Sequence, residues 1–236
     1  MHLPFWLTVA VLSPVLLYQG RKARRTTVRL PEAGGAPQGQ YGAGEPERRV
    51  LVLGESTAAG VGVQSHDQGL ASQLAKRLHQ RTGKTTAWHS YGINGATLAE
   101  LMAQLDLSAL PEADLVLLSM GVNDTTGLTP RHRYRQQVLA LRKDLTARFP
   151  GPLGLLSVPP MDQFTALPSP LRQVMGWRAR QLDRVYQDLA QTQPDAFVHL
   201  CYPTVTDPGL LAADGYHPGE RGYQLMGETL AELLDR

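Results

Sequence analysis

Five short, largely apolar segments separated by helical patterns constrain the fold of this chain more than any other feature. The strand candidates lie at 50–53, 85–91, 115–118, 153–158 and 196–200. Runs of this length and character are typical of strands that are buried on both faces. Between them, apolar residues recur at helical spacing, as Leu70, Leu74 and Leu78 do before Gly83. The later helices are expected near 98–105, 134–145, 170–192 and 218–234.

Strands that alternate with helices predict a parallel sheet with right-handed crossovers and a helical layer on each face. We therefore expect an α/β protein with five parallel strands. Ligands of such sheets bind beyond the carboxyl ends of the strands. The residues that follow each strand are thus the first candidates for a functional site.

The N-terminal segment has a separate character. Residues 3–18 carry no charge, and the basic cluster 21–25 follows them. As a helix these residues would reach roughly 24 Å, less than the ~30 Å hydrocarbon core of a bilayer. We interpret the apolar helix at 1–25 as a membrane anchor at a bacterial inner membrane, with the rest of the chain on the cytoplasmic side by the positive-inside rule. A helix packed on the domain and a periplasmic orientation are the alternatives.

Composition indicates where the domain begins and excludes some classes of function. Residues 31–47 are rich in glycine, proline and polar side chains, which predicts a flexible linker over 26–48 and a folded domain at 49–236. The net charge of only +2 leaves no footprint for nucleic acid. The single cysteine, Cys201, excludes an internal disulfide.

Polar residues that suit acyl transfer occupy the predicted site positions. Ser56 comes directly after the first strand, and small residues follow it. A serine hydroxyl becomes a good nucleophile when a neighbouring base takes its proton. His217 is the candidate base. Asp214, three residues earlier, is the candidate carboxylate that accepts the histidine Nδ1 proton and orients the ring.

A tetrahedral intermediate also needs hydrogen-bond donors for its negative oxygen. Two further glycine- and asparagine-containing segments follow predicted strands, at 92–95 and 121–124. The predicted oxyanion donors are the backbone N–H groups of Ser56 and Gly95 and the side-chain amide of Asn123. Asp124 is read either as a turn residue or as a carboxylate that orders the Asn123 loop.

These four blocks, GEST, NGAT, GVND and DGYHP, resemble those of the SGNH hydrolase superfamily, also called GDSL esterases and lipases. The resemblance covers about residues 49–236. It implies a flavodoxin-like three-layer α/β/α sandwich with a five-stranded parallel sheet, a Ser-His-Asp triad, and no metal or organic cofactor. The sequence departs from the family at Glu55, where the block name predicts aspartate. That departure puts the bracing of the nucleophile turn in question.

The sequence therefore predicts a serine esterase that hydrolyses acyl or aryl esters through an acyl-enzyme intermediate. Lysophospholipids and thioesters are further substrates that the resemblance implies. An acyltransferase to a sugar or lipid alcohol, and a non-catalytic binding module, are the alternatives. The α/β-hydrolase pattern G-x-S-x-G is not met, because Ala58 replaces its last glycine.

The expected partners are a small-molecule or lipid ester and, through residues 3–18, a membrane. For residues 161–170 two interpretations stay open: they line an acyl pocket, or they form a simple crossover loop.

Overall fold

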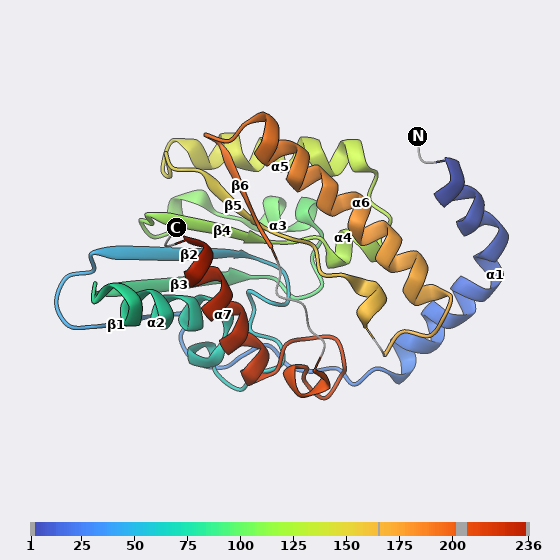
Figure 1. Cartoon of the computed structure of the whole chain (residues 1–236), viewed down its shortest axis with the longest axis horizontal. Helices are drawn as coiled ribbons and strands as arrows, with labels where there is room; N and C mark the ends of the chain where they lie inside the picture. The colour runs from blue at the N-terminus through green and yellow to red at the C-terminus, as the bar shows by residue number, and fades with distance from the viewer. Residues whose placement is uncertain (1–2, 165, 202–206, 235–236) are drawn as a thin grey trace.

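A six-stranded sheet forms the centre of the molecule (Figure 1). The computed structural model describes residues 3–164, 166–201 and 207–234. The strands are β1 (Gln38–Tyr41), β2 (Arg48–Gly54), β3 (Thr86–Gly92), β4 (Leu115–Ser119), β5 (Leu153–Leu156) and β6 (Phe197–Leu200). Their order is β1-β3-β2-β4-β5-β6. The pairs among β2 to β6 are parallel, and β1 runs antiparallel to β3. The α/β fold and the five expected parallel strands are confirmed, and the sheet has one strand more.

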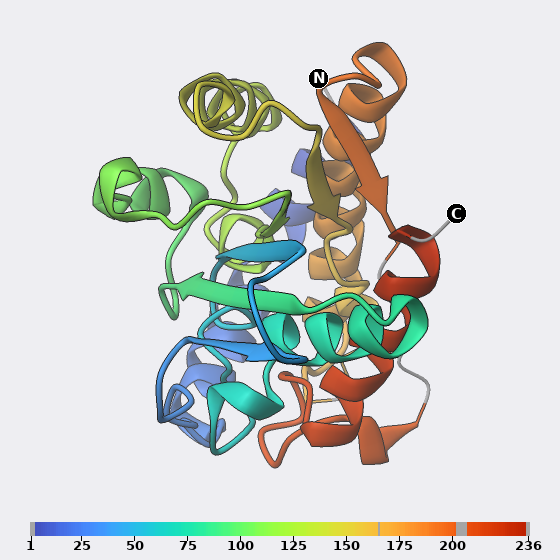
Figure 2. The ribbon, with the colours of Figure 1, turned by 90° about the vertical axis from the view of Figure 1, so that its left-hand side faces the viewer.

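Helices cover both faces of the sheet, as Figures 1 and 2 show. The helices are α1 (Leu3–Thr26), α2 (Leu70–Thr82), α3 (Leu98–Gln104), α4 (Val122–Thr126), α5 (Arg131–Thr146), α6 (Leu171–Thr192) and α7 (Glu220–Leu234). Side chains of α2 and α7 form the core on one face. Side chains of α3, α5 and α6 form the larger core on the other. The result is the expected three-layer sandwich.

Strand β2 shows why its sequence reads as a continuous apolar run. Val50 and Val52 belong to the core beneath α2 and α7, whereas Leu51 and Leu53 belong to the opposite core. All four side chains are at most 2% exposed. Because successive side chains of a strand point to opposite faces, burial on both faces removes the polar alternation of a half-exposed strand.

The expected linker over 26–48 is wrong in its central part. Strand β1 lies within it and pairs with the outer edge of β3, from Gln38 opposite His89 to Tyr41 opposite Thr86. Ahead of β1, Gly34 N donates to Gln64 O at 2.9 Å. The segment follows the domain surface because its backbone groups complete hydrogen bonds that β3 would otherwise leave to water. Its glycines and glutamines carry no apolar period that could have shown this.

Helix α1 packs along α6 (Figure 1). Phe5 and Leu16 are buried in the larger core, and the ring of Phe5 meets that of Trp177 edge-on at 5.3 Å. Gln19 joins the loop before α6, because its side chain donates to Ser169 O and accepts from Leu171 N. Over the described residues, no helix combines the length and apolar character needed to cross a membrane, so the expected anchor at residues 3–18 finds no support.

Candidate active site

The turn that carries Ser56 is held by the two strands beside β2. Glu55 N donates to Ser119 O at the end of β4, at 3.1 Å. On the other side, Ser90 Oγ donates to Ala58 O at 2.7 Å from within β3. Ser56 itself is 8% exposed. The predicted nucleophile thus sits at the carboxyl edge of the sheet in a turn with little freedom to move.

The second block approaches this turn so closely that only glycine fits. A Cβ on Gly92 would lie 2.1 Å from Ala59 N. Ile93 N then donates to Gly54 O at 3.1 Å, which ties the segment after β3 to the end of β2. Gly95 follows with open space around its Cα, since a Cβ there would meet no atom within 4 Å. The block is therefore fixed at its start and open at Gly95.

The pair predicted near the C-terminus forms in the structure. His217 Nδ1 and Asp214 Oδ2 lie 2.5 Å apart. Asp214 Oδ1 also accepts from the backbone N–H groups of Tyr216 and His217, at 3.0 and 3.1 Å. Burial by itself would raise the pKa of Asp214, but the hydrogen bonds from His217 and Tyr216 outweigh it and hold that pKa below its usual value. A carboxylate that stays ionised in this position fixes the ring and stabilises a positive charge on it.

The loop of His217 lies against the segment that follows Ser56. A Cβ on Gly62 would stand 2.2 Å from Pro218 O, so the two backbones are in contact. Tyr223, in the first turns of α7, donates its hydroxyl to Val61 O at 2.7 Å. The hydrogen bonds within the described part of the chain do not include one between Ser56 Oγ and His217. The structure therefore brings the two loops together and leaves the serine–histidine contact as a prediction.

The three predicted oxyanion donors differ in availability. In the described part of the chain, the backbone N–H groups of Ser56 and Gly95 donate to no protein acceptor. The Asn123 amide, in contrast, donates to Glu55 Oε2 and to Ala96 O, the latter at 3.2 Å. Its two N–H groups are thus both engaged, and a bound oxyanion would have to replace one of these acceptors.

Glu55 makes contacts that the sequence did not predict. Its carboxylate accepts from Val122 N at 2.8 Å, from Asn123 N at 3.0 Å and from the Asn123 amide. Complete burial raises the pKa of Glu55 to about 7. The hydrogen bonds from Asn123 and Val122 oppose this rise, and the nearby Asp124 adds to it. The sequence does show a carboxylate between a strand and the candidate nucleophile, and this position could have indicated that Glu55 belongs to the site. The partners of Glu55, however, lie in another block.

Asp124 links the second and third blocks. It is fully buried, and its Oδ2 accepts from Leu98 N at 2.9 Å, at the first turn of α3. This bond orients the start of α3, directly after the NGAT block, relative to the short helix α4 that carries Asn123. Of the two readings of Asp124, the ordering role has a contact to support it.

The loop considered as an acyl pocket reaches the site through one aromatic contact. Phe164 packs edge-on against Tyr216, with ring centroids 5.9 Å apart. Tyr216 is the neighbour of His217. The part of the loop that the structure describes therefore lies next to the histidine loop, as a pocket wall would.

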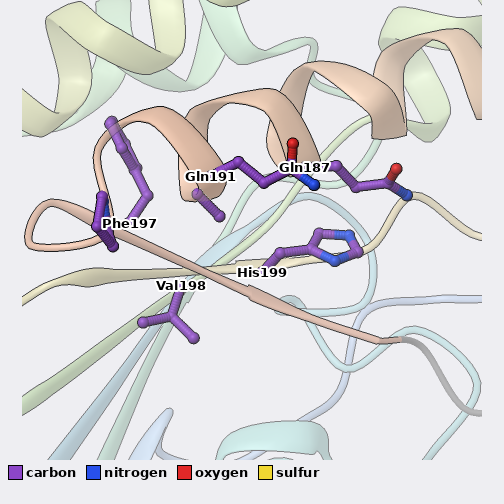
Figure 3. Close-up of a pocket in the computed structure, with 7 residues that line it drawn as sticks. Gln187, Gln191, Phe197, Val198 and His199 are labelled. Carbon is purple, nitrogen blue, oxygen red and sulfur yellow. The ribbon is translucent and has the colours of Figure 1, made fainter.

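A separate hollow lies between α6 and β6, away from these residues (Figure 3). Its lining consists of Gln187, Ala190, Gln191, Pro194, Phe197, Val198 and His199. His199 Nε2 is 3.1 Å from Asp183 Oδ1, which also accepts from Val158 N. Neither Ser56 nor His217 borders it. Across the described ranges, no group of three or more His, Cys, Asp or Glu side chains could hold a metal ion.

The fold, the order of the blocks and the Asp214–His217 pair are those expected of an SGNH-type hydrolase. Residues 52–225 match the GDSL-like lipase/acylhydrolase family, and the chain belongs to that family. It is similar to the GDSL-like esterase Rv1075c of Mycobacterium tuberculosis, with 28% identity over 189 residues. The match covers 77% of this chain and 60% of that protein, so the chain spans about 60% of its relative's length.

Solved structures share the fold. The psychrotrophic esterase EstA from Pseudoalteromonas sp. superposes with a TM-score of 0.60 at 17% identity, over 80% of this chain and 97% of EstA. The lipase/acylhydrolase from Enterococcus faecalis gives 0.58 at 20% identity, over 79% and 95% of the two chains. At these identities the likeness establishes the architecture alone.

Proposed function

We propose that the protein is a carboxylic ester hydrolase that works through an acyl-enzyme intermediate on Ser56. The observation that carries this proposal is the Asp214–His217 pair, on a loop whose Pro218 touches the segment following Ser56. A histidine with its Nδ1 held by a carboxylate presents Nε2 as a base, and the segment that Pro218 contacts follows the block that carries Ser56.

The reaction has two halves. His217 Nε2 takes the hydroxyl proton as Ser56 Oγ attacks the ester carbonyl carbon. The negative oxygen is held by the backbone N–H groups of Ser56 and Gly95 and by the side-chain amide of Asn123, which gives up its bond to Ala96 O. The tetrahedral intermediate collapses, the alkoxide leaves with the proton from His217, and the acyl group stays on Ser56. Water then repeats the sequence, with His217 again accepting and returning a proton, and releases the acid. Throughout, Asp214 stabilises the imidazolium.

The test is hydrolysis of p-nitrophenyl esters from acetate to palmitate by the full chain and by Ser56→Ala. We expect kcat/KM to fall by three or more orders of magnitude in the variant, as removal of a triad nucleophile does. Ser108→Ala, at an exposed position, is the matched control and should keep full activity. A fluorophosphonate probe should label the parent at Ser56.

Activity that persists in Ser56→Ala would contradict the proposal. A folded parent without hydrolysis and without labelling would favour a binding module. Hydrolysis that is replaced by ester exchange when a competing alcohol is added would favour acyl transfer over hydrolysis.

The protein is also proposed to associate with a membrane through α1, with the catalytic domain on the cytoplasmic side. What supports this is the sequence of the segment: an uncharged stretch at 3–18 is followed by basic residues at 21–25, which suit the negatively charged cytoplasmic leaflet. Reaction of an introduced cysteine with a membrane-impermeant thiol reagent, in intact and in opened cells, tests the orientation. Labelling in intact cells would overturn the cytoplasmic assignment.

A further inference from the structure

Exposed apolar side chains gather on one helix. Eight large hydrophobic side chains are exposed in the described part of the chain, and six of them belong to α1. They are Trp6, Leu7, Val11, Val15, Leu17 and Tyr18, and Val11 is 77% exposed. Contiguous apolar surface of this kind marks an interaction site in soluble proteins.

The packing of α1 fixes which face looks outward. Phe5 and Leu16 are buried against α6, and Gln19 is hydrogen-bonded to Ser169 and Leu171. Leu7, Val11, Val15 and Tyr18, spaced by three or four residues, lie on the side away from these contacts. The helix is therefore apolar on both faces, with one face covered by the domain and the other open.

Charge identifies what covers the open face. The stripe of Leu7, Val11, Val15 and Tyr18 continues along the same side of the helix to Lys22 and Arg25, both exposed. An apolar stripe ending in cations suits a helix that lies in the headgroup region of anionic lipids. Because α1 contains no acidic residue, a second copy of the same face would offer these cations no counter-charge.

We propose that the outward face of α1 binds the surface of a bilayer that contains anionic lipids, with the helix lying flat and still packed on α6. Trp6 and the stripe enter the headgroup boundary, and the basic end contacts lipid phosphates. The binding needs no catalytic residue and is independent of the esterase reaction.

The same contact places the catalytic edge near the lipid. The C-terminal part of α1 is joined to the loop before α6, at the carboxyl end of the sheet. The chain then passes the site, where Ala33 N donates to Ala59 O and Glu32 accepts from Asn94 N. Resting on the proposed esterase function, this places the block that carries Ser56 on the side of the domain that faces the bilayer.

Cosedimentation of the full chain with vesicles tests the binding. Phosphatidylcholine vesicles are compared with vesicles that contain one quarter phosphatidylglycerol, at low and high salt. We expect tighter binding to the anionic vesicles and loss of that difference as salt rises. Val11→Asp should lower the partition coefficient on both, and Lys22→Glu with Arg25→Glu should lower it by roughly tenfold or more on anionic vesicles only. Val198→Asp, at an exposed valine of β6, is the matched control and should bind as the parent does.

The depth of the helix distinguishes a flat from a crossing arrangement. Brominated lipids should quench Trp6 and a tryptophan introduced as Val11→Trp in a Trp6→Phe background to the same shallow depth. Deeper quenching at position 11 would overturn the flat arrangement. Failure of the parent to bind anionic vesicles would overturn the proposal, as would a dimer that Val11→Asp dissociates without any vesicle binding.

Hydrolysis of soluble p-nitrophenyl acetate separates the two proposals. We expect this activity to be unchanged in the α1 variants. Vesicle binding without Ser56-dependent hydrolysis would refute only the esterase, whereas hydrolysis without binding would refute only the lipid surface.

Discussion

Replacing Glu55 by glutamine should make the enzyme more stable and less active. Burial raises the pKa of this carboxyl from 4.5 to about 7. Between these two pH values the folded protein holds a proton that the unfolded chain has released, so the free energy of unfolding falls as pH rises. A difference of about 2.5 pKa units corresponds to roughly 3 kcal/mol. Glutamine has the shape of the neutral acid and does not ionise. Glu55→Gln avoids this penalty, so at pH 8 its unfolding free energy should exceed that of the parent by up to about 3 kcal/mol, reduced by the contact between its amide and a buried N–H donor. Below pH 5 the two values should be similar.

Activity should move the other way, because the ionised carboxylate is the form that can accept from Val122 N, Asn123 N and the Asn123 amide together. Glutamine has one acceptor oxygen, and its amide must face at least one of these donors. The loop that presents Asn123 should shift, and we expect kcat/KM at pH 8 to fall by roughly 10- to 100-fold.

The pH profile separates this role from a purely structural one. The parent needs an ionised Glu55, so log kcat/KM should fall more steeply on the acid side than it does in a variant without this carboxyl. In Glu55→Gln this ionisation is gone, and the acid limb should be less steep by one unit of slope. The ionisable neighbours of Glu55 are Asp124 and the buried hydroxyls of Tyr134 and Tyr186.

Chemical denaturation at pH 5 and pH 8, together with p-nitrophenyl ester kinetics from pH 5 to 9, measures both effects. Glu112→Gln, at an exposed glutamate, is the control and should match the parent. A glutamine variant less stable than the parent at pH 8, or one with the parent's slope and rate, would refute the reasoning.

Three further substitutions test the site. Asp214→Asn should lower kcat by roughly 10³- to 10⁴-fold with the denaturation midpoint nearly unchanged, because an amide does not hold the required histidine tautomer; an unaltered kcat would remove Asp214 from the triad. Gly92→Ala should lower the free energy of unfolding by more than about 3 kcal/mol in a denaturation experiment, because the alanine Cβ would overlap Ala59 N. Gly20→Ala is the control and should not destabilise the fold, since the space around Gly20 is open. Tyr223→Phe should lower the unfolding free energy by about 1–2 kcal/mol through loss of the hydrogen bond to Val61 O; no change in the denaturation curve would show that this bond is dispensable.

The parts of the fold that the sequence predicted are those with strong periodicity. Leu70, Leu74 and Leu78 lie on the buried face of α2, and Gly83 follows its last turn, as expected. The four apolar residues of β2 divide between two cores, so their unbroken run was a reliable sign of a central strand. The position of Ser56 followed from the same reasoning, because parallel strands collect their carboxyl ends at one edge.

The parts that could not be predicted depend on contacts between distant segments. Strand β1 has four residues and no apolar alternation, and the free edge of β3 alone determines it. The high pKa of Glu55 arises from its burial in the folded protein, and the amide of Asn123 is engaged by a contact between blocks 68 residues apart. The sequence shows that a carboxylate and an amide are present and does not show that they bind each other.

Strand β1 has a consequence for work with shortened forms of the protein. It occupies the outer edge of β3 through Gln38 to Tyr41. A variant that begins after residue 41 would leave a row of unpaired backbone N–H and C=O groups on β3. Such open edges promote pairing between separate molecules, and hence aggregation. A form that lacks α1 but remains monodisperse should therefore begin ahead of Glu32, so that both β1 and the contact with Asn94 are kept.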